Sequence, residues 1–147
     1  MGAIPNLVFI FFILIIFFLN KPNRSFVNYY IFFLAILAGF FLDIFSYTYF
    51  GPSVVILIII GFLLKKIQLL LKNGESEYPF VYFLSLFLIS LLIFELLSSI
   101  IIQLIYQGTV MFTFSMGIIF SLIYNLFFAS IMFYVYKRFF KKITDTL

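Results

Sequence analysis

The sequence predicts an all-α integral membrane protein, a compact bundle of five transmembrane helices forming a single polytopic domain over residues 1–147. Its composition is the first reason, because 66% of the residues are hydrophobic. Only 10% are charged, whereas ordinary soluble domains carry roughly 25%. So few charged side chains cannot cover a folded surface in water, and we therefore expect lipid as the solvent.

The positions of the charged residues are the second reason, because they divide the chain into five apolar segments. Each has about the length of the ~20-residue helix that crosses a hydrocarbon core of ~30 Å. The run from Val54 to Leu64 shows no alternation of apolar and polar side chains, which favours helices over barrel strands. The segments are 4–19, 26–46, 50–64, 80–106 and 110–136.

The first segment lacks the basic start of a signal peptide, so we expect it to remain in the mature protein. The third segment contains Gly51 and Pro52 near its start, a pair typical of a turn followed by a helix that starts at proline. This third segment is short, since Lys65 follows soon after. A re-entrant hairpin is therefore the alternative to a true span, and it would divide the basic residues between the two faces.

The basic residues indicate the topology, because short loops rich in Lys and Arg stay in the cytoplasm. All nine follow the first, third or fifth segment, whereas residues 1–3, 47–49 and 107–109 carry no charge. We therefore expect the N-terminus outside and the C-terminus in the cytoplasm. The basic rim fits anionic lipid headgroups, and nothing indicates nucleic-acid binding. The nine residues are Lys21, Arg24, Lys65, Lys66, Lys72, Lys137, Arg138, Lys141 and Lys142.

Two carboxyl groups fall inside the apolar segments, where ionised groups are costly and therefore suggest a function. Asp43 lies about one turn from the outer end of the second segment, just before Ser46. We expect its carboxylate to accept hydrogen bonds from the backbone N–H groups near Gly51 and so to fix that corner. A structural role is favoured over a catalytic one.

Glu95 lies near the middle of the fourth segment, at about the depth of Ser121 and one turn from the depth of Asn125. We expect Glu95, with Ser98, Ser99 and Gln103, to pack against the fifth segment. There a small or polar residue recurs every fourth position and forms one helix face. Helix packing is favoured over an ion path. The repeating residues are Thr113, Gly117, Ser121, Asn125 and Ala129, with a shorter version at Ala35, Gly39 and Asp43.

Enzyme chemistry is not indicated. The chain has no Cys and no His, so the usual ligands of zinc, haem and iron–sulfur clusters are missing. Asp43 and Glu95 are expected at different depths, without a basic partner inside the membrane. We therefore expect no catalytic residue, no metal and no cofactor.

Residues 39–51 read G-x-x-x-D-x-x-S-x-x-x-x-G, with Gly39, Asp43, Ser46 and Gly51 at the fixed positions. This pattern resembles the signature of the bacterial rod shape-determining protein MreD family. The likeness extends over residues 5–66 by motif and over 67–147 by hydropathy and length. The resemblance implies a six-span family fold, of which this chain would lack the first helix, similar to the substrate-binding subunits of energy-coupling-factor vitamin transporters.

The resemblance also implies a function and partners. The protein would be a non-enzymatic subunit of the cell-elongation complex in the bacterial cytoplasmic membrane, contacting an MreC-like bitopic protein. Through that partner it would reach actin-like MreB and the peptidoglycan synthases. A vitamin-binding transporter subunit is the alternative, although the short outer turns offer few polar groups to orient a ligand. Proton-coupled transport through Asp43 and Glu95 is a third interpretation. Candidate contact residues are Gly39, Asp43, Ser46, Gly51, Glu95, Gly117, Ser121 and Asn125.

The expected topology can be tested by cysteine labelling, since the natural chain has no cysteine to give a background. Single cysteines at Thr48 and Thr109 should react with a membrane-impermeant reagent from outside, because the positive-inside rule places both turns there. Cysteines at Asn73 and Thr144 should react only after the membrane is permeabilised. Outside labelling of position 73 would contradict the five-span topology.

Overall fold

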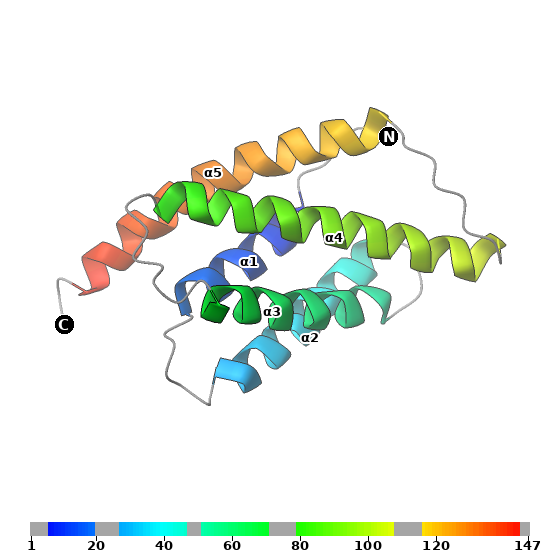
Figure 1. The fold of residues 1–147 in the computed structure, drawn as a ribbon, viewed down its shortest axis with the longest axis horizontal. Coiled ribbons are helices and arrows are strands. Elements are labelled where there is room, and N and C mark those ends of the chain that lie inside the picture. Colours follow the sequence, from blue (N-terminus) through cyan, green and yellow to red (C-terminus); the bar gives the residue numbers. More distant parts are fainter. Residues whose placement is uncertain (1–5, 20–26, 47–50, 71–78, 108–115, 145–147) are drawn as a thin grey trace.

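A computed structural model describes residues 6–19, 27–46, 51–70, 79–107 and 116–144. In this part of the chain the fold is all-helical, with five helices in sequence order (Figure 1). Their bounds are α1 Leu7–Leu19, α2 Val27–Ser46, α3 Pro52–Leu70, α4 Pro79–Gln107 and α5 Met116–Thr144.

Three of these helices are long and apolar enough to cross a membrane. The qualifying stretches are Pro52–Leu70 in α3, Pro79–Ile101 in α4 and Ile119–Arg138 in α5. The apolar stretches of the other two helices are shorter, Leu7–Phe18 in α1 and Tyr29–Phe45 in α2. These lengths are consistent with a protein that crosses a membrane more than once.

The predicted end of the third segment was wrong, because α3 continues beyond residue 64 to Leu70. The predicted segment stops before Lys65 and Lys66, but lysine favours helix, and its long stem can lie along apolar surface while the ammonium reaches polar surroundings. The result is one unbroken helix of 19 residues, about 28 Å at 1.5 Å per residue. A re-entrant hairpin over Pro52–Leu70 is therefore wrong.

The bounds of the other helices agree with the predicted apolar segments to different degrees. Helix α4 begins and ends within one residue of the predicted 80–106. Helix α5 runs on past 136 to Thr144, because the basic residues again continue the helix. Residues 110–115 of the predicted fifth segment lie outside the described part. Helix α1 begins at Leu7 rather than at residue 4.

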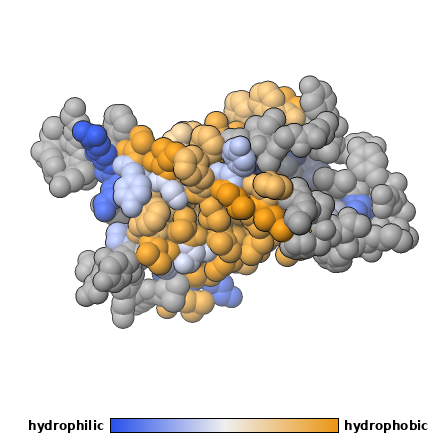
Figure 2. All heavy atoms as spheres, turned by 90° about the horizontal axis from the view of Figure 1, so that it is seen from above, coloured by the Kyte–Doolittle hydropathy of each residue, from blue (hydrophilic) through white to orange (hydrophobic). Residues whose placement is uncertain are grey.

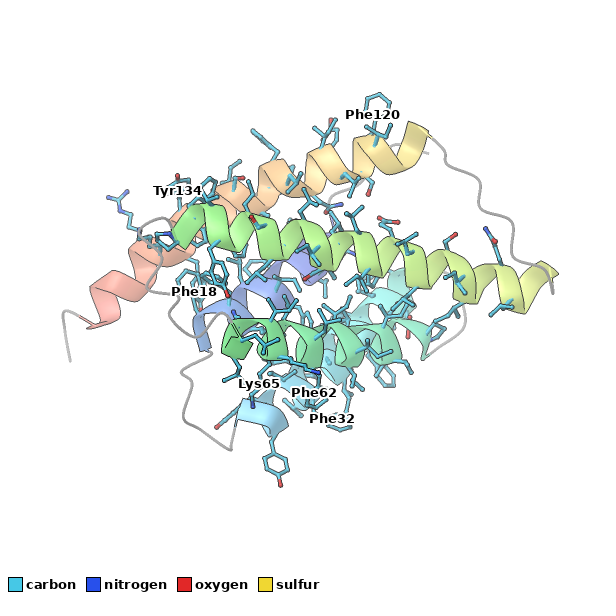
Figure 3. All side chains as sticks on the ribbon, in the orientation of Figure 1. Phe18, Phe32, Phe62, Lys65, Phe120 and Tyr134 are labelled. Carbon is cyan, nitrogen blue, oxygen red and sulfur yellow. The ribbon has the colours of Figure 1, made fainter. Side chains whose placement is uncertain are left out.

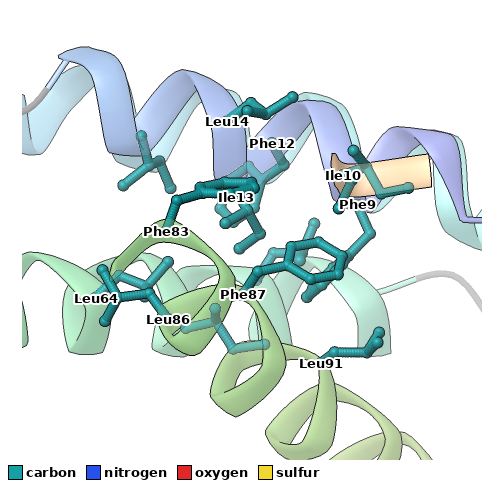
Figure 4. Close-up of a cluster of buried hydrophobic side chains, with 14 of the residues drawn as sticks. Phe9, Ile10, Phe12, Ile13, Leu14, Leu64, Phe83, Leu86, Phe87 and Leu91 are labelled. Atoms are coloured by element: carbon teal, nitrogen blue, oxygen red, sulfur yellow. The ribbon is translucent and has the colours of Figure 1, made fainter. Parts of the chain in front are cut away.

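Helix α1 is the centre of the bundle, and it contacts each of the other four helices. Residues around its circumference are buried, among them Phe9, Phe12 and Leu14. In the close-up of the core, α1 meets the buried side chains of α4 and α3 (Figure 4). Phe9 packs against Phe87 with ring centroids 5.8 Å apart. The shortest helix thus holds the longer ones together.

A cluster of aromatic rings joins the start of α4 to the later part of α5. Phe83 stacks on Phe133 with ring centroids 4.9 Å apart, and Phe17 meets Phe83 edge-on at 5.2 Å. Aromatic pairs at these separations contribute about 0.5–1.5 kcal/mol each beyond the area they bury. These phenylalanines therefore have a packing role.

The outer faces of α2 and α5 are apolar. Phe45 on α2 is 72% exposed and Phe127 on α5 is 62% exposed. Phe120 and Tyr134 project from α5 on one side of the bundle, and Phe32 projects on the opposite side (Figure 3). A space-filling view shows apolar residues over the middle of one face, with hydrophilic residues toward its ends (Figure 2). Such a surface suits lipid rather than water.

Candidate functional site

The connection between α2 and α3 is organised by the carboxylate of Asp43. Its Oδ2 accepts a hydrogen bond from the Gly51 N–H at 2.7 Å, and its Oδ1 accepts one from the Ser53 N–H at 3.1 Å. The side chain is only 2% exposed. The capping role expected for Asp43 is therefore confirmed.

Asp43 takes the place of the side chain that normally caps a helix. Gly51 occupies the capping position of α3, since its carbonyl accepts the hydrogen bond from the Val55 N–H at 3.2 Å. Glycine has no side-chain oxygen to accept the free N–H groups of the first turn. Asp43 supplies two oxygens from a neighbouring helix, and its negative charge lies at the positive end of the α3 dipole.

The two glycines of the signature are each required for a different reason. Gly51 has a φ of +114°, a conformation that side-chain-bearing residues rarely adopt. Gly39 lies where α2 presses on the start of α3. A Cβ added to Gly39 would overlap the Val54 Cα and lie 2.6 Å from the Val54 nitrogen. Only a residue without a side chain permits this approach of the two backbones.

The predicted small-residue face of α2 is buried as expected. Ala35 is fully buried, Gly39 is buried, and Asp43 follows one turn later on the same face. Ser46 is the last residue of α2, and its side chain lies outside the described part. The three described positions thus form the seam between α2 and α3.

A second polar set links α4, α5 and the start of α1. The Ser121 Oγ donates to Glu95 Oε1 at 3.2 Å, which confirms the predicted match in depth. Asn125 Nδ2 donates to the Ser121 carbonyl at 2.9 Å and lies 3.2 Å from the Ser121 Oγ. Asn125 is 2% exposed, whereas Glu95 and Ser121 are half-buried.

Asn6 is the member of this set that the sequence interpretation missed. Its backbone N–H donates to Asn125 Oδ1 at 2.7 Å, and its own Oδ1 accepts from the Phe9 N–H at 3.0 Å. Asn6 therefore caps α1 and ties it to α5. The signal was available, because asparagine directly before an apolar run is typical of a helix start.

Three residues expected to pack with Glu95 against the fifth segment show hydrogen bonds within α4. The Ser98 Oγ donates to the Glu95 carbonyl at 3.1 Å, and Gln103 Nε2 lies 3.4 Å from the Ser99 Oγ. Hydroxyls in helices often bond to the preceding turn in this way. These bonds lie within α4, so the packing of the three side chains against the fifth segment stays a prediction.

Of the remaining members of the α5 repeat, the structure describes the surroundings of Ala129 alone. Ala129 is fully buried, as a packing face requires. Gly117 lies in the first turn of α5, and its surroundings are outside the described part, as is Thr113. Within the described residues α2 and α4 make no contact, so Asp43 and Glu95 belong to two separate sites.

Comparisons of the chain with protein-family models, with curated proteins and with solved structures gave no match. The family resemblance of residues 39–51 therefore stays a prediction.

We expect Asp43→Ala to destabilise the protein, because it leaves the Gly51 and Ser53 N–H groups without their acceptor. Loss of a helix cap costs about 0.5–2 kcal/mol. Thermal unfolding of the detergent-purified protein measures the change. Ile44→Ala is the matched control, since Ile44 is the next residue of α2 and is 52% exposed. Equal stability of the two variants would contradict the capping role.

Glu95 should tolerate replacement by glutamine and not by lysine. Glutamine keeps an oxygen that accepts from Ser121, whereas lysine places a charge within the span at about 2.5–3.5 kcal/mol. The amount of folded protein recovered from membranes is the measurement. A comparable loss in Glu95→Gln and Glu95→Lys would show that Glu95 acts as a charge rather than as a packing group.

Proposed function

We propose that this protein is a non-enzymatic, five-span subunit of the bacterial cell-elongation complex. In the cytoplasmic membrane it would hold an MreC-like bitopic partner and, through that partner, act with MreB and the peptidoglycan synthases. The observation that carries the proposal is the α2–α3 corner. Three of the four residues that resemble the MreD signature, Gly39, Asp43 and Gly51, lie at that corner.

The corner supports the proposal because its parts depend on one another. Gly39 allows the backbones of α2 and α3 to meet, Gly51 allows the chain to turn, and Asp43 fixes the start of α3. Three residues at fixed spacings with three different physical tasks are typical of a motif rather than of a chance pattern. Such a corner is a structural element, which suits a scaffold.

The use of the polar groups supports a scaffold as well. Asp43, Ser121 and Asn125 each bond to the chain itself, and the outer faces of α2 and α5 are apolar. A partner that binds such a body within the bilayer brings a transmembrane helix. Helix association in lipid depends on close packing and on hydrogen bonds between helices.

The proposal is tested by depletion and by co-purification. Depletion of the protein from a rod-shaped bacterium should produce rounded cells with misplaced wall synthesis. Purification in mild detergent should recover a bitopic, MreC-like protein. Asp43→Ala should lower that recovery several-fold more than Phe45→Leu, because Phe45 is 72% exposed and lies on the same helix. Normal rod shape after depletion, with a vitamin bound to the purified protein, would favour the transporter subunit instead.

A further inference from the structure

The second half of α4 is only half-buried, and it carries polar residues. Phe83, Leu86, Phe87, Ser90 and Leu91 are buried. Beyond Leu91 none of the α4 side chains that the structure describes is buried. Four polar residues follow among the described side chains of this stretch, and we call them the α4 polar strip: Glu95, Ser98, Ser99 and Gln103.

The strip differs from the lipid-facing surfaces elsewhere on the protein. The exposed residues of α2, and those of α5 up to Val135, are phenylalanine, tyrosine, leucine, isoleucine and valine, which lipid accommodates without cost. Ser98, Ser99 and Gln103 make hydrogen bonds within α4, but a carboxyl group in a half-covered position is costly against lipid, because the hydrocarbon offers it no hydrogen bonds. Glu95, Ser98 and Ser99 lie within the apolar stretch of α4 that is long enough to span.

Only one of the two carboxyl oxygens of Glu95 has a hydrogen-bond donor among the described residues. Its Oε1 accepts from the Ser121 Oγ at 3.2 Å. Its Oε2 meets no hydrogen-bond donor among the residues that the structure describes, and no lysine or arginine of that part pairs with it. A half-buried carboxyl group within a membrane helix needs a partner for its second oxygen.

We propose that the α4 polar strip is the docking surface for a transmembrane helix of another protein. That helix would carry a hydrogen-bond donor side chain, basic or amide, at the depth of Glu95. The argument is chemical complementarity, since Glu95 Oε2 is an acceptor that no donor among the described residues reaches. The proposal rests on the proposed function in naming the MreC-like protein as the expected owner of this helix.

Co-purification separates this contact from a purely internal role of Glu95. Glu95→Leu removes the acceptor and should lower recovery of the bitopic partner at least five-fold per folded molecule. Ser121→Ala breaks the internal bond but leaves the carboxyl group, so recovery should change less than two-fold. Ser85→Leu is the matched control, because Ser85 is an exposed serine of the same helix that bonds to the Val81 carbonyl. Equal losses in Glu95→Leu and Ser121→Ala would overturn the docking surface.

Photocrosslinking tests the surface without assuming which protein binds it. A photoreactive amino acid at Ser99 should give an adduct in intact membranes. The same probe at Phe127, on the exposed face of α5, should not. Mass spectrometry should place the crosslink in a membrane segment that bears a donor side chain near the depth of Glu95. An adduct with a wholly apolar segment, with a second copy of this chain or with lipid alone would overturn the proposal.

The two proposals fail in different ways. If the wild-type protein retains no MreC-like partner but Ser99 crosslinks to another donor-bearing helix, the function is wrong and the docking surface stands. If the MreC-like partner is retained equally by the wild type and Glu95→Leu, the docking surface is wrong and the function stands.

Discussion

The structure depends on the need of each buried polar group for a hydrogen-bonding partner where water is absent. Two sets of hydrogen bonds meet this need and thereby fix the helices. Asp43 holds the first turn of α3 against the end of α2. Glu95, Ser121, Asn125 and Asn6 connect α4, α5 and α1. In lipid, apolar surface alone does not choose between neighbouring helices, so these polar contacts act together with close packing to select which helices meet.

Helix α1 shows how an apolar helix acquires a unique position under this constraint. It is apolar throughout Leu7–Leu19, so no amphipathic pattern distinguishes one of its faces. Its register is set at its start, where the Asn6 N–H binds Asn125 Oδ1. The rings of Phe9 and Phe17 then pack against α4. One polar anchor and shape complementarity thus replace the hydrophobic drive of a soluble core.

The sequence could predict features that follow from local chemistry or from depth. Apolar length predicted the existence and order of the helices, a carboxylate near a glycine–proline turn predicted the cap, and equal distances from a shared turn predicted Glu95 beside Ser121. The end of α3 was missed because charge marks the end of an apolar segment and not that of the helix. The bonds of Ser98 and Gln103 were missed because a hydroxyl or amide chooses between its own helix and a neighbour by side-chain rotamer, which spacing does not determine.

The two joints of the bundle differ in what holds them. Between α2 and α3 the backbones touch at Gly39 and Val54, and charge-assisted bonds from Asp43 close the corner. Another helix could insert between α2 and α3 only by separating the two backbones and breaking the hydrogen bonds of Asp43. Between α4 and α5 at Ser121, one hydroxyl–carboxyl bond of 3.2 Å joins half-buried side chains. Among the described residues no donor binds the second oxygen of that carboxyl group, so this joint can accept a further contact without losing its own.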